Sequence, residues 1–189
     1  MVVEPELQRV VDYSVQIQVA DRIKVVAVGR FDTDPMGQYL GHWLGAVQRG
    51  LPSDILRFVH GNGADPKRWK RIVEKTALVV GEALRAKGYR GPAGIDAMIY
   101  RNGEGFNVRP IVEVNPRYTM GRIAHEISKH VAPMQPAYFG IAPWKKTPES
   151  QMRYRNGLFA EGTVRLTSEN HPIGAYVCVG NDSTQRRKK

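Results

Sequence analysis

Apolar and polar residues alternate near the start of the chain in the pattern of an antiparallel hairpin. Every second residue from Tyr13 to Val19 is apolar, as expected for a strand with one buried face. Asp21 and Arg22 then form a tight connection to a more apolar strand, Ile23 to Val28. The other face of the first strand carries Asp12, Ser14, Gln16 and Gln18.

The next segment, residues 29–45, is rich in Gly, Asp and Pro and therefore predicts a loop. A plain connection and a binding loop fit it equally well, because it also contains side chains suited to binding. These are Arg30, Gln38, Tyr39, His42 and Trp43. If it is a binding loop, we expect it to contact the substrate that accepts the reacting group.

Two later segments repeat their apolar residues at helical spacing. The first follows Asp65, a good N-cap, and Pro66, a good first helical residue, and it ends at Gly88. Its apolar side is formed by Trp69, Ile72, Val73, Thr76, Val79, Val80, Ala83 and Leu84. The second predicted helix runs from Met120 to Val131, and Pro133 ends it.

A second hairpin is predicted between these helices. Ile95 to Tyr100 has the composition of a strand, the sequence RNGEG is a strong turn signal, and Phe106 to Asn115 is the return strand. After the second helix, a Pro-rich stretch predicts irregular structure. Two short strands follow it, Leu158 to Thr167 and Ile173 to Val179.

These elements predict an α+β fold, with an antiparallel sheet, helices on one of its faces and a small β extension. We expect a main domain over residues 1–131 and a Pro-rich segment with short strands over residues 132–180. A basic, disordered tail is expected over residues 181–189.

The charge of the chain limits its partners. Its formal net charge is +10 and its pI about 9.9, which suits nucleic acid or a phosphorylated small molecule. The predicted first helix has a basic face, but most such faces are only solvated, so nucleic acid is not the favoured partner. This face carries Lys67, Arg68, Lys70, Arg71, Lys75 and Arg85.

The cellular location follows from two absences in the sequence. No apolar run approaches the roughly 20 residues that cross a bilayer, so we expect no membrane association. The single cysteine, Cys178, cannot form a disulfide within the chain and is interpreted as a buried strand residue. Both observations fit a cytoplasmic protein.

The return strand of the second hairpin is unusually polar at its end. Glu113, Asn115 and Arg117 occupy alternate positions and can share one face, while Val112 and Val114 face the core. If the turn is centred between Glu104 and Gly105, Asp96 stands opposite Glu113 on that face.

Two facing carboxylates need a positive group between them. Arg117 is one candidate, and a hard divalent cation is another, because Asp96, Glu113 and Asn115 offer only oxygen ligands. With Mg²⁺ in place, Arg117 would meet a phosphate with its planar fork. A solvated hairpin with an ordinary salt bridge explains the same residues equally well.

The sequences GPAGIDAMIY (91–100) and RPIVEVNPRYTMG (109–121) resemble the C-terminal half of the ATP-grasp superfamily. These enzymes activate a carboxylate as an acyl phosphate and transfer it to an amine or similar nucleophile. The resemblance implies that Asp96, Glu113 and Asn115 bind Mg²⁺ or Mn²⁺ with ATP. It also implies that Arg117 contacts a phosphate or the acyl phosphate.

The start of the chain, VVEPELQRVVDYSVQIQV (2–19), resembles the adenine-binding linker of the same superfamily and the strands that follow it. The resemblance implies that Glu4 binds the adenine amino group or the ribose. Backbone groups near Glu6 and Leu7 would meet the adenine edge, and Asp12 would make a polar contact near the ribose or the substrate.

Members of this superfamily also carry a lysine and a glycine-rich lid upstream of the linker, and this chain begins at the linker. We therefore expect the metal- and phosphate-binding half of an ATP-dependent carboxylate ligase. The lid is expected from a partner subunit, from another copy of the chain or from a longer protein. The alternative hypothesis is a non-enzymatic basic module that binds nucleic acid or an acidic protein.

Overall fold

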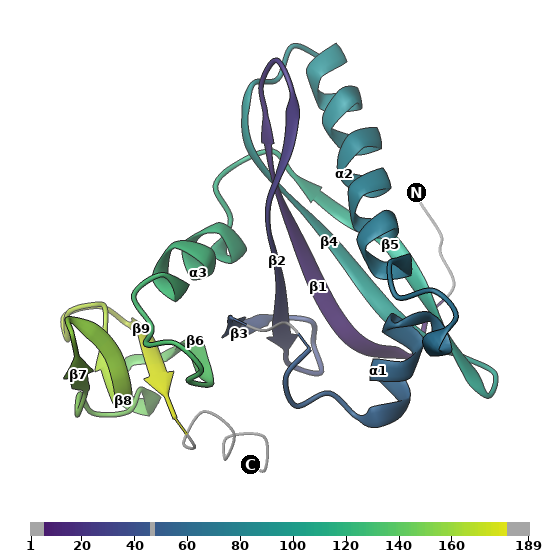
Figure 1. The fold of residues 1–189 in the computed structure, drawn as a ribbon. Helices are drawn as coiled ribbons and strands as arrows, with labels where there is room; N and C mark the ends of the chain where they lie inside the picture. The colour runs from purple at the N-terminus through teal and green to yellow at the C-terminus, as the bar shows by residue number, and fades with distance from the viewer. Residues whose placement is uncertain (1–5, 46–47, 181–189) are drawn as a thin grey trace. The chain divides into compact units, whose positions relative to one another are not determined.

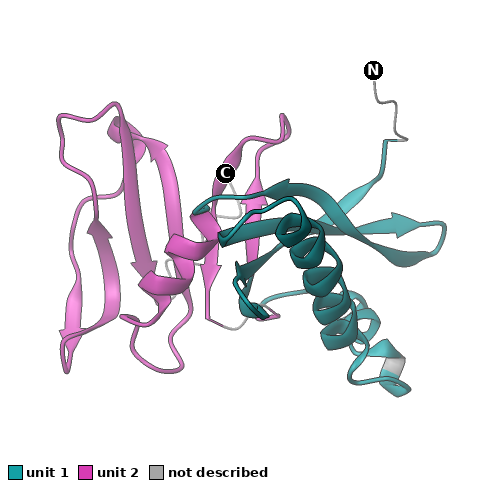
Figure 2. Cartoon of the chain, turned by 90° about the horizontal axis from the view of Figure 1, so that it is seen from above, with its two compact units in different colours: residues 1–28, 50–119 teal, residues 29–49, 120–189 magenta. Residues whose placement is uncertain are grey.

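The structure is a computed structural model that describes residues 6–45 and 48–180 (Figure 1). The chain forms two compact units (Figure 2). Unit 1 comprises residues 1–28 and 50–119, and unit 2 comprises residues 29–49 and 120–189. Each unit is discontinuous in sequence, whereas the division expected from the sequence follows the chain in order with a boundary at residue 131.

Unit 1 is a sheet of long strands with a long helix against it (Figure 1). The strands lie in the order β5-β4-β1-β2, and β4 pairs antiparallel with both β1 and β5. The elements are β1 (Arg9–Val19), β2 (Ile23–Thr33, in this unit as far as Val28), α1 (Ser53–Val59), the 3₁₀ turn η1 (Gly61–Gly63), α2 (Arg68–Ala86), β4 (Gly91–Asn102) and β5 (Gly105–Asn115).

The core of unit 1 lies between α2 and one face of the sheet. The predicted apolar face of β1 packs there with residues of β4 and of α2. Gly81 of α2 permits the close approach of β2, because a Cβ at this position would lie 2.5 Å from Cγ2 of Ile23. The buried residues of this core are Val15, Ile17, Val19, Val73, Ala77, Val80, Ala93 and Ile95.

The start of α2 differs from the prediction. The helix begins at Arg68, with Lys67 at the N-cap, so Asp65 and Pro66 belong to the preceding turn. Asp65 instead pairs its carboxylate with Arg71 in the first turn of the helix. The C-terminal signal is confirmed, because Gly88 follows the helix with a φ of +80°, which is favourable for glycine.

Unit 2 combines a second antiparallel set of strands with one helix. The strands lie in the order β2-β3-β6-β9-β8-β7, where β2 contributes its residues from Gly29 onward. The elements are β3 (Tyr39–Leu44), α3 (Met120–Ser128), β6 (Ala137–Pro143), the 3₁₀ turn η2 (Trp144–Lys146), β7 (Arg153–Arg155), β8 (Leu158–Arg165) and β9 (Ile173–Val179).

Three strands of unit 2 lie where the sequence predicted none. The segment 29–45 contains the end of β2 and all of β3, and the stretch that was expected to be irregular contains β6 and the short β7. Strands β3 and β6 were missed because Gly41 and Gly140 interrupt the apolar alternation, although the two glycines pair with each other across the ladder. The α+β class with antiparallel pairing is nevertheless confirmed.

The two faces of the unit 2 strands differ in character. One face, with Leu44, Phe139, Val177 and Val179, packs with Ala124 of α3. The other face is aromatic and polar. Its side chains lie in register across the strands: Arg30 is 4.6 Å from the ring centre of Trp43, and Trp43 meets Tyr138 edge-on at 5.2 Å.

Among residues 6–45 and 48–180, no helix is long and apolar enough to span a bilayer.

On the aromatic and polar face, tyrosine rings pack directly over glycine residues: Tyr138 over Gly41 and Tyr176 over Gly140. Because Gly140 lies opposite Tyr176, a Cβ at residue 140 would overlap the Tyr176 ring, which is buried and has little room to move. We predict that Gly140→Ala lowers the free energy of unfolding by about 1–3 kcal/mol, measured by urea denaturation. The control is Gly105→Ala, where the nearest atom is 3.8 Å away and no left-handed φ is required. Equal stability of both variants would contradict this packing.

Candidate functional site

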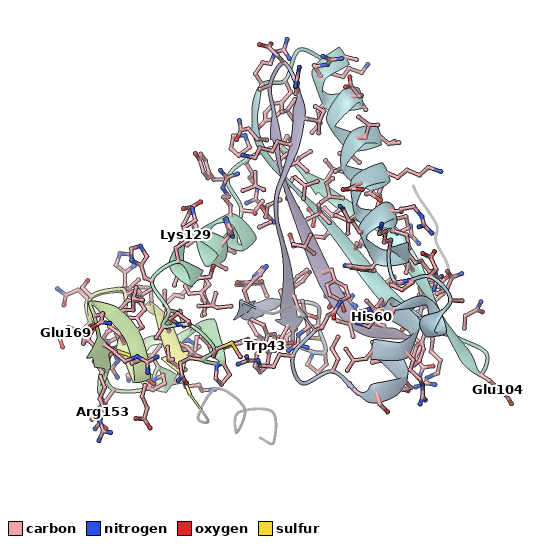
Figure 3. All side chains as sticks on the ribbon, in the orientation of Figure 1. Trp43, His60, Glu104, Lys129, Arg153 and Glu169 are labelled. Carbon is pink, nitrogen blue, oxygen red and sulfur yellow. The ribbon has the colours of Figure 1, made fainter. Side chains whose placement is uncertain are left out.

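The β4–β5 hairpin places Asp96 directly opposite Glu113, as predicted. The route to this pairing was not predicted. The turn is centred between Gly103 and Glu104, one position earlier than expected, and Glu104 lies at its tip (Figure 3). An irregularity in the ladder between Asp96 and Met98 then restores the expected pair.

This irregularity is a β-bulge on the edge strand β5. Three residues of β5, Pro110 to Val112, lie opposite Ala97 alone, since Met98 pairs with Arg109 and Asp96 with Glu113. Proline, which has no N–H to donate, is tolerated in such a bulge. The bulge also explains why Val112, expected in the core, is 49 % exposed.

Two further polar side chains follow Glu113 on β5 and beyond it. Asn115 donates a long hydrogen bond from Nδ2 to Oδ2 of Asp96, at 3.4 Å. Arg117 donates from Nη2 to Oδ1 of Asn115, at 3.1 Å. Asp96, Asn115 and Arg117 are therefore linked, and Glu113 stands across the ladder from Asp96.

The polar face of β1 continues this cluster. Ser14 pairs with Asp96 in the β1–β4 ladder, and its hydroxyl hydrogen-bonds the Asp96 carboxylate. Gln16 donates from Nε2 to Oγ of Ser14 at 2.6 Å, and Thr119 donates from Oγ1 to Oε1 of Gln16 at 2.6 Å. The sequence prediction omitted Ser14, Gln16 and Thr119 from the site. The polar alternation of β1 was the available signal for the first two.

Asp96 is held in an unfavourable environment for a negative charge. Burial raises the pKa of its carboxyl above the ordinary value, and the fields of Glu113 and Asp12 raise it further. The hydrogen bond from Ser14 and the charge of Arg117 act in the opposite direction. A cation bound beside Asp96 would relieve this excess of negative charge.

The remaining predicted residues lie on or before β1. Asp12 stands on the same face as Ser14 and forms an ion pair with Arg9 at 3.4 Å. Its negative charge is close enough to raise the pKa of Asp96. Glu6 is exposed and Leu7 half-buried in the segment that leads into β1. Glu4 lies outside the described residues.

The donor set limits what this site can hold. Within the described part of the chain, no three His, Cys, Asp or Glu side chains form a group that could hold a metal ion. Mg²⁺ commonly uses only one or two carboxylates and completes its shell with water and phosphates. Asp96, Glu113 and the amide oxygen of Asn115 fit this requirement, because that oxygen has a second lone pair besides the one facing Arg117.

The structure is similar to several solved proteins. One is described as an ATP-grasp superfamily protein and comes from Archaeoglobus fulgidus, with a TM-score of 0.46 and 15 % identity, over 92 % of this chain and 46 % of that one. Another is the N5-carboxyaminoimidazole synthetase of Staphylococcus aureus, solved with ADP, with a TM-score of 0.46 and 11 % identity, over 98 % and 50 %. A third is the L-amino acid ligase of Bacillus licheniformis, with a TM-score of 0.44 and 12 % identity, over 95 % and 51 %.

This chain thus spans about half the length of the solved proteins that it resembles. No family model and no curated protein matches the sequence. Because the TM-scores lie below 0.5, the case for function depends on the hairpin face itself.

The raised pKa of Asp96 has a consequence for stability. As the pH rises from the usual carboxyl pKa to the raised one, the folded chain retains a proton that the unfolded chain loses, so stability falls. Above that range, the ionised Asp96 continues to destabilise the fold. We predict that Asp96→Asn stabilises the metal-free chain at neutral pH and that the gain disappears near pH 3, below the usual Asp pKa of about 3.9.

Urea denaturation with a chelator present measures this difference. Asp21→Asn, at an exposed position between β1 and β2, controls for the loss of one charge. A destabilised Asp96→Asn variant at neutral pH, with Asp21→Asn unchanged, would contradict the electrostatic description.

Proposed function

We propose that this chain is the metal- and phosphate-binding half of an ATP-dependent carboxylate ligase of the carboxylate–amine type. Asp96, Glu113 and Asn115 hold Mg²⁺ or Mn²⁺ against the phosphates of ATP, and Arg117 contacts the transferred phosphoryl group or the acyl phosphate. One observation carries this proposal. The half-buried carboxylate of Asp96 faces the exposed carboxylate of Glu113 across the β4–β5 ladder, and the guanidinium of Arg117 is linked to Asp96 through Asn115.

The charges of the site suit phosphoryl transfer. When bound, the cation would neutralise phosphate charge and hold the phosphates in place. Asp96 and Glu113 supply the negative charge that retains the cation, and Asn115 orients Arg117 through its amide oxygen. Arg117 is exposed beyond the end of β5, so its planar fork is accessible to two phosphate oxygens at once. Such preorganised charges supply most of the catalysis in this class of reaction.

The nucleotide base is proposed to lie against the segment before β1. Backbone groups of Glu6 and Leu7 would bind the adenine edge, and Glu4 would bind its amino group or the ribose. Asp12, whose charge raises the pKa of Asp96, would make a polar contact near the ribose or the substrate. We also propose that the chain acts on a carboxylate substrate and an amine or similar nucleophile, and that a further subunit or a second copy of the chain covers the phosphates.

The alternative, a basic module for polyanions, is less well supported by the side chains of α2. Lys70 lies 3.6 Å from Glu74, and Arg71 pairs with Asp65. Arg68 stacks on the Phe58 ring at 4.4 Å and donates to a backbone carbonyl. These cations already have partners within unit 1. Salt-dependent retention of RNA that is lost when they are neutralised, and that does not change in Glu113→Ala, would favour the alternative.

We predict that Glu113→Ala weakens binding of Mn²⁺ with ATP by about tenfold or more, because it removes one ligand of the cation. Mn²⁺ electron paramagnetic resonance, supported by calorimetry with Mg²⁺ and ATP, measures this affinity. The matched control is Glu104→Gln at the tip of the same hairpin, which should bind as wild type does (Figure 3). Equal binding by Glu113→Ala and wild type would exclude the site.

A further inference from the structure

The side chains behind Asp96 form one continuous chain of hydrogen bonds, which the proposed function does not explain. It begins at Thr119, passes through Gln16 and Ser14 of β1, and reaches Asp96 on β4. From there it continues through Asn115 to Arg117, two residues before its starting point. The chain thus links three strands and the segment that follows β5.

The hydrogen bonds of this chain have a fixed direction. Thr119 donates to the amide oxygen of Gln16, so the amide nitrogen of Gln16 is turned toward Ser14 and donates to its oxygen. The hydroxyl proton of Ser14 is then directed to the Asp96 carboxylate. Asn115 also donates to Asp96. An ionised carboxylate only accepts hydrogen bonds, so every donor here is correctly oriented for it.

The inner part of the network is buried. Gln16 is 2 % exposed, Ser14 3 % and Thr119 9 %. Buried amides and hydroxyls are costly unless they are hydrogen-bonded, and an apolar face would avoid this cost. Gly94 leaves the space for the network, because a Cβ there would lie 2.7 Å from Cγ2 of Thr119 and 3.4 Å from Nε2 of Gln16.

We infer that Ser14, Gln16 and Thr119 are positioning residues that orient the Asp96 carboxylate toward Glu113 and so preorganise the cation site. This inference rests on the proposed function, since it concerns the same site. The network fixes the orientation of Asp96 from the side opposite β5. It also fixes Thr119, which lies two residues after Arg117, so the cation-binding and phosphate-binding groups are set together.

The test replaces the first hydroxyl of the network. Thr119→Val keeps the shape of the side chain and removes the donor to Gln16. We expect about 10- to 100-fold weaker Mn²⁺ binding, the range seen when groups that support metal ligands are lost. Thr119→Ser retains the hydroxyl and should restore the affinity to within about twofold. Gly94→Ala, which crowds Thr119 and Gln16, should weaken Mn²⁺ binding like Thr119→Val.

Thr76→Val is the matched control. Thr76 is a buried threonine of α2 in the same unit and lies outside the network. It should bind Mn²⁺ as wild type does, whatever its stability. If Thr119→Val is folded, as judged by urea denaturation, and binds Mn²⁺ as tightly as wild type, the positioning role is overturned.

A nuclear magnetic resonance measurement without metal tests the hydrogen-bond network independently of cation binding. In wild type, the side-chain amide protons of Gln16 should give dispersed, slowly exchanging nuclear magnetic resonance signals. Thr119→Val should change the chemical shifts of these signals and speed their exchange with water, whereas Thr76→Val should not.

The Mn²⁺ affinities of two variants distinguish a failure of the proposed function from a failure of the positioning role. If Glu113→Ala binds Mn²⁺ as wild type does, the proposed function falls and the positioning role falls with it. If Glu113→Ala loses binding but Thr119→Val does not, only the positioning role falls.

Discussion

The negative charge of Asp96 is the constraint on which the arrangement of unit 1 depends. Its carboxylate is partly buried and lies in the field of two other carboxylates, Glu113 and Asp12. Burial and like charges both oppose ionisation, so the fold must compensate with hydrogen bonds and with Arg117. The polar face of β1, the bulge in β5 and the burial of Gln16 can each be understood as part of that compensation.

The two faces of β1 show how the sheet meets this constraint without losing its core. Val15, Ile17 and Val19 pack with α2, and that contact supplies the apolar burial of the unit. The intervening residues are then free to be polar. A shift of one residue in the β1–β4 register would exchange the two faces, so the α2 contact also fixes where Ser14 stands opposite Asp96.

Much of this site could be predicted from the sequence, because it depends on local geometry. Alternation along β1 and β5 assigned the faces, and counting from the turn placed Asp96 opposite Glu113. That count succeeded although its turn centre was wrong, because the bulge adds two residues to β5. An even number of extra residues keeps Glu113 on the face of Asp96, whereas an odd number would have moved it to the other face.

The parts that could not be predicted depend on contacts distant in sequence. Thr119 and Gln16 are 103 residues apart, and no spacing rule connects them. Strands β3 and β6 were missed for a similar reason, since Gly41 and Gly140 have no apolar pattern and become strand residues only by pairing with each other. Local propensity is weak at such positions, and tertiary pairing decides the structure.

The hydrogen-bond donors around Asp96 are oriented to stabilise a carboxylate in one particular protonation state. If Asp96 were protonated, it would become a donor and would compete with the donors from Ser14 and Asn115. The network is therefore fully satisfied only by the ionised carboxylate, which is the form that burial and Glu113 disfavour. These opposing effects leave a carboxyl group that is held in one orientation and lacks a neighbouring positive charge large enough to offset its burial. A divalent cation would supply the missing positive charge, and a phosphate bound to that cation would meet Arg117 on the same face.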